Sequence, residues 1–221
     1  CYLRKDKIAI VVPCFNESKT ILKVYQNAKN FGKVLIVDDA STDETREILK
    51  RKKIKFLSNK ENLGYESSLK NGFNYVFKKW KKTKYIATLD ADGELLSKYL
   101  NKLSKKLIRE NLDIVIGSRK KLNRVSERIL KIIFNIKYNI DDPISGIKIY
   151  RKKVLKKITN FSSNSLFLVD IIIFAYFEKF LISSVEVDVK KRRDKPRVGN
   201  IFSTNLKILK IIYYSMFPKK I

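Results

Sequence analysis

The chain has 221 residues, of which 44% are hydrophobic and 32% are charged, with 7 Gly and 4 Pro. This composition is that of a globular chain rather than a disordered one, and the length suits one domain. The sequence holds no His and 2 Cys. It therefore excludes Ser-His-Asp and Cys-His catalysis, zinc sites built on His and a disulfide framework, and it leaves oxygen-ligated Mg, Mn or Ca as candidate metals.

Basic residues dominate the charge: 49 Lys+Arg stand against 22 Asp+Glu, a formal net charge of +27. Such an excess favours an anionic partner, such as nucleic acid, anionic lipid headgroups or phosphorylated substrates. Drift toward Lys, Asn and Ile in an AT-rich genome is the alternative explanation. Local clusters of charge are therefore better evidence than the total.

Short apolar runs alternate with helical patterns along the first half of the chain. This alternation predicts an α/β fold with a mainly parallel sheet and helices on both faces, in which ligands bind beyond the carboxyl ends of the strands. The predicted strands are residues 7–13, 33–39, 54–58, 85–90 and 113–118, and the predicted helices are residues 19–30, a segment that begins at Ser41 or Thr42, 65–80 and 95–109.

The second half is less regular, and it shows neither an internal repeat nor a linker, so we expect one domain over residues 1–221. Bases alternate with apolar residues at helical spacing over 119–138 and over a terminal amphipathic helix, 201–217. Between them we expect strands at 147–150 and 184–189, helices at 154–158 and 169–180, and a basic loop at 190–200.

No stretch predicts a secretory signal or a transmembrane helix. The most apolar stretch, residues 166–182, is interrupted by Asp170 and other charges. We therefore expect a cytoplasmic protein that is peripheral to the cytoplasmic face of a membrane. The amphipathic segments 119–137 and 201–220 have the composition of helices that lie on anionic lipid, although packing against a core explains the same pattern.

Acidic residues follow several of the predicted strands. Asp90 and Asp92 flank one residue after an apolar strand, so both side chains point the same way and can share a divalent cation that also binds a diphosphate. Glu94 can add a third ligand. The alternative is an acidic turn that ends the strand and caps the next helix.

Two other strand ends carry polar side chains. Asp38 and Asp39 can accept hydrogen bonds from a nucleobase or a ribose, or can serve as acids near a helix N-terminus. Pro13, followed by Asn16 and Glu17, can shape a nucleotide pocket or form an ordinary loop between a strand and a helix.

Six segments in order carry a family resemblance: VVPCFNE, LIVDDASTD, NLGYESSLKNGF, YIATLDADGE, DIVIGSR and DDPISGIKIYR. Together they resemble the family-2 glycosyltransferases of the GT-A fold, and within that family the polyprenyl-phosphate (dolichyl-phosphate) mannosyl- and glucosyltransferases. The resemblance runs from about residue 8 to residue 150. It departs from the usual pattern at Phe15 and Ala40, and the late basic segment before Gly199 is blurred.

The resemblance implies roles for individual residues. The nucleotide-sugar site would comprise Pro13, Asn16, Glu17, Asp38, Asp39, Gly64 and Asp90. A divalent cation, Mg or Mn, would be held by Asp90, Asp92 and Glu94. The catalytic residues would be Asp92, Arg119 and Ser145, the last two near the transferred sugar. The acceptor phosphate would be held by Arg119, Ser145 and Arg197, and Asp142 would shape its loop.

The implied reaction is an inverting, metal-dependent transfer of a hexose from a nucleotide-sugar of the GDP-mannose or UDP-glucose type to a polyprenyl phosphate. A phosphate acceptor is anionic at pH 7 and needs no general base, but it needs cations to hold it. Polyprenyl-phosphate synthases often carry membrane-spanning segments, so a membrane subunit is a possible partner.

Two alternatives stay open. A family-2 glycosyltransferase that acts on a glycan hydroxyl would need a carboxylate base, for which Asp170 is the candidate. A basic nucleic-acid-binding module would explain the charge, but the sequence has no recognisable nucleic-acid signature and the acids at the strand ends would have no role. We therefore expect no nucleic-acid partner.

Overall fold

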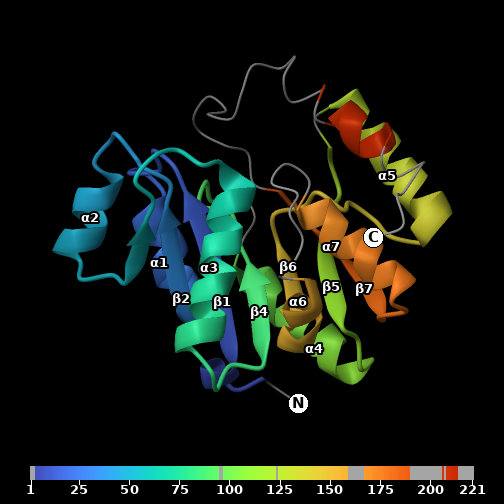
Figure 1. Ribbon diagram of the computed structural model, residues 1–221, viewed down its shortest axis with the longest axis horizontal. Coiled ribbons are helices and arrows are strands. Elements are labelled where there is room, and N and C mark those ends of the chain that lie inside the picture. Colours follow the sequence, from blue (N-terminus) through green and yellow to red (C-terminus); the bar gives the residue numbers. More distant parts are fainter. Residues whose placement is uncertain are drawn as a thin grey trace.

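The computed structural model describes residues 3–94, 97–122, 124–158, 167–189, 206 and 208–213. A seven-stranded sheet in the order β3-β2-β1-β4-β6-β5-β7 forms its centre (Figure 1). β6 runs antiparallel to β4 and β5, and the other pairs are parallel. The strands are β1 (Ile8–Cys14), β2 (Lys33–Asp38), β3 (Phe56–Ser58), β4 (Tyr85–Thr88), β5 (Ile114–Arg119), β6 (Lys148–Arg151) and β7 (Ile182–Val187).

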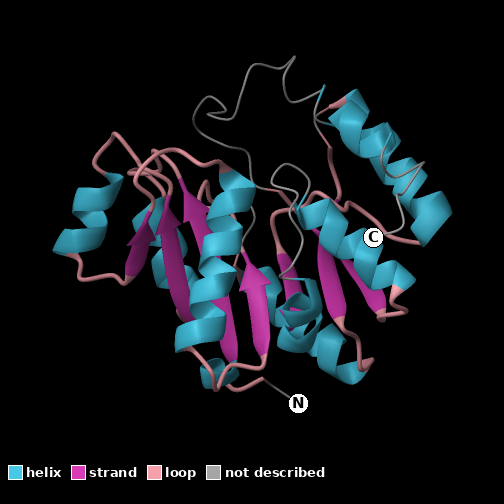
Figure 2. Cartoon of the chain, in the orientation of Figure 1, coloured by secondary structure: helices cyan, strands magenta, loops and turns pink. Residues whose placement is uncertain are grey.

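Helices cover both faces of the sheet (Figure 2). Successive residues of a strand point to opposite faces, and each residue of β1 is buried, so this strand contributes to two separate hydrophobic cores. One face carries α1 (Ile21–Ala28), α2 (Thr45–Arg51) and α4 (Lys98–Arg109), and the other carries α3 (Tyr65–Lys79), α5 (Val125–Tyr138), α6 (Lys152–Ile158) and α7 (Phe167–Phe177). A short 3-10 helix, η1 (Lys5–Lys7), precedes β1.

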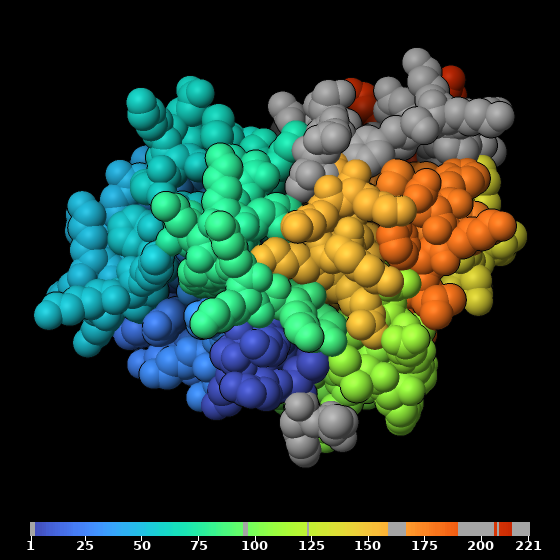
Figure 3. All heavy atoms as spheres, turned by 60° about the horizontal axis from the view of Figure 1, so that its bottom comes forward, coloured from blue at the N-terminus to red at the C-terminus, as the bar shows by residue number. Residues whose placement is uncertain are grey.

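The helices of the second face lie next to one another on the surface. In the space-filling view the green of the α3 region borders the gold of α6, which borders the orange of α7 (Figure 3). α5 extends toward the carboxyl ends of the strands (Figure 1), and its C-terminal Tyr138 packs against Tyr176 of α7, with 5.0 Å between the ring centroids. The described residues of the terminal helix approach the start of α5, because Ile208 and Ile211 line a cavity together with Arg124 and Glu127.

The α/β class and the mostly parallel sheet agree with the sequence expectation. One difference has a local cause. α2 begins at Thr45 rather than at Ser41 or Thr42, because residues 41–43 hydrogen-bond the loop after β1 instead. The predicted basic loop 190–200 lies outside the described residues, and the predicted helix 201–217 is described only at 206 and 208–213, where it is helical.

A close approach of α3 to the sheet depends on Gly72. A Cβ at this position would lie 2.4 Å from Val11 Cγ1 and 3.1 Å from Val37 Cγ2. Both valines are fully buried in the core beneath α3. The missing side chain therefore sets how closely the middle of α3 packs on β1 and β2.

Gly72→Ala is expected to lower the free energy of unfolding by about 1–3 kcal/mol, because overpacking a buried contact outweighs the gain in helix propensity. Denaturant unfolding at pH 7 measures this change. Asn74→Ala is the matched control, since Asn74 is exposed on the same helix. A Gly72→Ala variant as stable as the wild type would contradict the packing argument.

Candidate functional site

A cavity of about 450 Å³ opens at the carboxyl ends of the central strands. It lies between β1 and β4, where the strand order reverses direction, which is the usual ligand position in open α/β sheets. Its walls come from the ends of β1, β2 and β4, the start of α3 and the loop before β6. The lining residues are Pro13, Cys14, Phe15, Glu17, Asp39, Asn62, Gly64, Tyr65, Ser68, Asp90, Ala91, Asp92, Ile144 and Gly146.

Pro13 explains why the sheet opens here. β1 pairs with β2 as far as Cys14–Asp38, but with β4 only as far as Val11–Thr88. The carbonyl of Val11 accepts from Leu89 of the β4 side, so Pro13, two residues on, faces the same side and has no N–H to continue the ladder. The two strands can therefore separate around the cavity.

Asp39 fastens the loop that follows β3. Its Oδ1 accepts from Asn59 Nδ2 at 2.7 Å and from the Leu63 N–H at 2.9 Å, and its Oδ2 accepts from the Gly64 N–H at 2.8 Å. Gly64 has a φ of 86°, a conformation that favours glycine. Asp39 thus shapes the cavity wall and still presents a carboxylate edge to the cavity.

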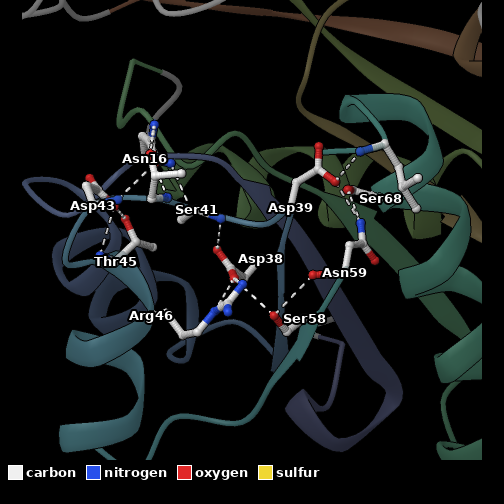
Figure 4. Close-up of polar contacts among 12 residues, drawn as sticks. Asn16, Asp38, Asp39, Ser41, Asp43, Thr45, Arg46, Ser58, Asn59 and Ser68 are labelled. Carbon is white, nitrogen blue, oxygen red and sulfur yellow. Dashed lines mark hydrogen bonds and ion pairs between the residues drawn. The ribbon is translucent and has the colours of Figure 1, made fainter. Parts of the chain in front are cut away.

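Asp38 points the opposite way (Figure 4). Its carboxylate is fully buried, accepts from Arg46 Nε at 2.9 Å and from Ser58 Oγ at 3.2 Å, and also accepts from the Ser41 N–H. Asp38 does not line the cavity. Because neighbouring residues at a strand end project to opposite sides, only one of the paired acids reaches the pocket.

Asn16 also lies away from the cavity lining. It has a φ of 56°, and its Oδ1 accepts from the backbone N–H groups of Thr42 at 2.7 Å and Asp43 at 3.2 Å (Figure 4). It therefore joins the loop after β1 to the loop after β2. Glu17, by contrast, lines the cavity, and its Oε2 accepts from Thr20 Oγ1 at 2.9 Å.

Asp90 projects from the end of β4 into the cavity wall. Tyr65 at the start of α3 donates its hydroxyl to Asp90 Oδ1 at 2.7 Å. Burial raises the pKa of Asp90 by more than the Tyr65 hydrogen bond and the Arg119 charge lower it. Burial, with the Asp90 charge, raises the pKa of Tyr65 well above 10.0, so this phenol keeps its proton.

The predicted acidic triplet is only partly assembled. Asp92 lines the cavity, and its Oδ1 accepts from the Glu94 N–H at 2.9 Å, which closes a turn after β4. Glu94 is not among the cavity residues. No group of three acidic side chains in the described part of the chain converges as a metal site. Asp90 and Asp92 offer the hard oxygen ligands that Mg²⁺ or Mn²⁺ requires, provided that a bound diphosphate supplies further oxygens.

Arg119 at the end of β5 is held by acids. Its Nε donates to Asp142 Oδ2 at 2.7 Å, its Nη2 donates to Asp142 Oδ1 at 2.9 Å, and its Nη1 lies 3.7 Å from Glu127 Oε1. Ser145 is fully buried and donates its Oγ to the Gly117 carbonyl at 2.6 Å. Both predicted acceptor residues therefore fix the loop 141–146 against β5.

A second cavity, of about 820 Å³, lies between the end of β5 and α5. Its lining combines basic side chains with apolar ones. Lys131 reaches back to β5, where its Nζ donates to Ser118 Oγ at 3.2 Å. We call this cavity the basic groove; it is lined by Arg119, Lys120, Lys121, Leu122, Arg128, Lys131, Ile132, Asn135, Ile136 and Asp141.

The loop 141–146 forms part of both cavities. Asp141 lines the basic groove, and Ile144 and Gly146 line the first cavity. Asp170, the predicted base for a hydroxyl acceptor, lies in the first turn of α7 and lines neither cavity. Arg197, predicted to bind phosphate, lies outside the described residues.

Lys148 in β6 was not predicted as a site residue. It is fully buried, its Nζ donates to the carbonyl oxygen of Ser145, and burial lowers its pKa to about 8 although Asp142 and Asp90 act in the opposite direction. A lysine at an inward position of an otherwise apolar strand is the sequence signal that could have identified it. Tyr65 carries no such signal, because a tyrosine at the start of a helix is unremarkable.

Residues 9–172 match the family described as Glycosyl transferase family 2. The chain belongs to this family. An uncharacterized protein of Methanocaldococcus jannaschii is 32% identical over 170 residues, which cover 71% of this chain and 69% of that protein.

Two further likenesses bear on the site. A UDP-N-acetylglucosamine–dolichyl-phosphate N-acetylglucosaminyltransferase of Methanococcus voltae is 23% identical, over 67% of this chain and 71% of that protein. A solved structure of glucosyl-3-phosphoglycerate synthase from Mycobacterium tuberculosis, in complex with Mn²⁺, UDP-glucose and phosphoglyceric acid, superposes with a TM-score of 0.75 and 16% identity, over 97% of this chain and 81% of that one. The fold of this glycosyltransferase is therefore GT-A.

Lys148→Met tests the cost of burying the ammonium. A pKa that falls from 10.5 to about 8 on folding means that the unfolded chain binds more protons between these pH values, so stability rises with pH through this window. The free energy of unfolding of the wild type, minus that of Lys148→Met, is expected to increase by about 3 kcal/mol between pH 7 and pH 11. Denaturant unfolding at several pH values measures it, and a difference that does not change with pH would show that Lys148 is not buried as a charge.

Proposed function

We propose that this glycosyltransferase moves a sugar from a nucleoside-diphosphate donor to a polyprenyl phosphate, with inversion at the anomeric carbon. The observation that carries the proposal is the pairing of two cavities across the loop 141–146. One is lined by carboxylates at the switch point of the sheet, and the other is a basic groove with an apolar rim on α5. The first suits a nucleotide-sugar and a cation, and the second suits a phosphate attached to a hydrocarbon chain.

The donor belongs in the first cavity. Pro13, Glu17, Asp39 and Gly64 would contact the nucleoside, and Asp90 and Asp92 lie where the diphosphate would be. A divalent cation on Asp92 and the diphosphate would neutralise the charge that develops on the leaving group. The Mn²⁺ and UDP-glucose bound by the mycobacterial synthase support a nucleotide-sugar and a divalent cation here.

The acceptor phosphate belongs in the basic groove. Arg119 is largely committed to Asp142, so Arg128 and Lys131 are the groove cations that we expect to bind the phosphate, with Arg119 at the inner end. A phosphate oxygen is already a nucleophile at pH 7, which fits a site without His. The dolichyl-phosphate substrate in the name of the Methanococcus relative supports the same acceptor class.

The lipid would reach the groove from a membrane surface. The outer face of α5 exposes Val125, Ile129, Ile132 and Ile136, with 69%, 45%, 58% and 81% of each residue accessible. Their spacing makes one apolar stripe beside the basic groove, as in helices that lie in a membrane interface. No helix in the described ranges is long and apolar enough to cross a bilayer.

Transfer of radiolabel to a short polyprenyl phosphate tests the proposal. UDP-glucose, UDP-N-acetylglucosamine and GDP-mannose are offered separately with Mn²⁺, and again with EDTA. We expect label in the organic phase from one donor, its loss with EDTA, and a fall of at least about a hundredfold in kcat for Asp92→Asn with little change in the melting temperature. Full transfer by Asp92→Asn would remove Asp92 from the cation site.

A glycan hydroxyl acceptor is the second candidate, supported by the family itself. It predicts metal-dependent consumption of a donor without label in the organic phase. Absence of donor binding and of turnover with each nucleotide-sugar would overturn both.

The apolar stripe of α5 gives a separate test. The double variant Ile132→Glu, Ile136→Glu is expected to reduce binding to vesicles that contain anionic lipid by at least about tenfold, because both side chains would otherwise be buried in the interface. Sedimentation with vesicles measures binding. Leu181→Glu is the matched control, because Leu181 is 53% exposed but lies at the opposite end of β5 and β7, and unchanged binding of the double variant would remove α5 from the membrane contact.

A further inference from the structure

The Asp90 carboxylate is fixed by one hydrogen bond. Within the described ranges, Tyr65 is the only residue that donates to it, with 2.7 Å between the Tyr65 hydroxyl and Asp90 Oδ1. Lys148 and Arg119 act on Asp90 through their charges, without a hydrogen bond. The hydrogen bonding that orients this carboxylate therefore comes from a single phenol.

Gly146 limits the carboxylate from the other side. A Cβ on Gly146 would lie 1.8 Å from Asp90 Oδ2 and 2.2 Å from Asp90 Cγ. The carboxylate thus occupies the space that any other residue at 146 would fill. The loop that carries Gly146 is itself held, since Lys148 binds the Ser145 carbonyl and Ser145 Oγ binds the Gly117 carbonyl.

A neighbouring tyrosine, Tyr150, offers a comparison for the phenol of Tyr65. Tyr150 lies in the same core, and its hydroxyl is buried without a partner among the described residues. Packing in this region therefore does not require a bonded phenol. Tyr65 differs from Tyr150 because it lines the donor cavity and holds one of the carboxylates there.

We propose that Tyr65 is a positioning residue, whose hydroxyl, opposed by Gly146, holds Asp90 in the orientation that receives the cation and diphosphate of the donor. Tyr65 acts through Asp90 and takes no part in bond breaking. This inference rests on the proposed function, because it needs a nucleoside diphosphate in the first cavity. It adds a residue that affects donor affinity indirectly, through the orientation of Asp90.

The test is a double-mutant cycle on nucleotide binding. Calorimetric titration with UDP and Mn²⁺, and in parallel with GDP and Mn²⁺, is carried out on the wild type, Tyr65→Phe, Asp90→Ala and the double variant. Tyr65→Phe is expected to weaken binding about 10- to 100-fold, as for the loss of a hydrogen bond to a charged group. In the Asp90→Ala background the same change is expected to alter the affinity less than about twofold, because its target is gone.

Matched variants separate positioning from structure. Tyr150→Phe removes an unpartnered phenol nearby and is expected to leave nucleotide affinity unchanged. Gly146→Ala displaces the carboxylate from the opposite side and is expected to weaken binding as Tyr65→Phe does. In transfer assays Tyr65→Phe is expected to raise KM for the donor while KM for the acceptor stays within about twofold.

Three results would overturn the inference. They are wild-type affinity in Tyr65→Phe, an equal loss in the wild-type and Asp90→Ala backgrounds, or an equal loss in Tyr150→Phe. Failure of the wild type to bind either nucleotide would overturn the proposed function together with this inference. Wild-type binding with an unaffected Tyr65→Phe would overturn the inference alone.

Discussion

The site depends on the early end of the ladder between β1 and β4. Pro13 has no N–H to donate toward β4, so the two central strands separate while β1 still follows β2. Asp90 and Asp92, which follow β4, can then line the cavity between the two strands. α3 must start directly above this opening to bring Tyr65 to Asp90, and the missing side chain of Gly72 allows its close approach.

Buried charge is the second constraint. Asp142 and Lys148 lie behind the cavities and Arg119 lines the basic groove, and each would be costly to bury without its opposite charge. Their pairing leaves the loop 141–146 bonded at Asp142 and Ser145, so its backbone is well fixed where both cavities meet. The cations that remain accessible for an acceptor are those of the basic groove, on α5 and the segment before it.

Much of the fold followed from local patterns, because buried strands and amphipathic helices have different periods and acids cluster where strands end. The same reasoning indicated Pro13, Glu17, Asp39, Asp90 and Asp92, and the family resemblance implied Gly64. All six line one cavity. This reasoning could not predict which of Asp38 and Asp39 lines the cavity, because adjacent residues at a strand end differ only in the side of the strand to which their side chains point. Nor could it predict that Asp142 forms an ion pair with Arg119, or that Tyr65 donates a hydrogen bond to Asp90. Both contacts join segments that are far apart in the chain.

The loop 141–146 has a consequence for how such an enzyme can change. Its residues are a wall of the donor cavity on one side and of the basic groove on the other. Under the proposed function, a substitution there would alter the surroundings of both substrates at once, so selection for a new sugar through this loop would also disturb the acceptor. The loop 59–64, which Asp39 holds, borders the first cavity and contributes nothing to the groove. Engineering of donor preference would then be better begun at 59–64, where a change leaves the basic groove intact.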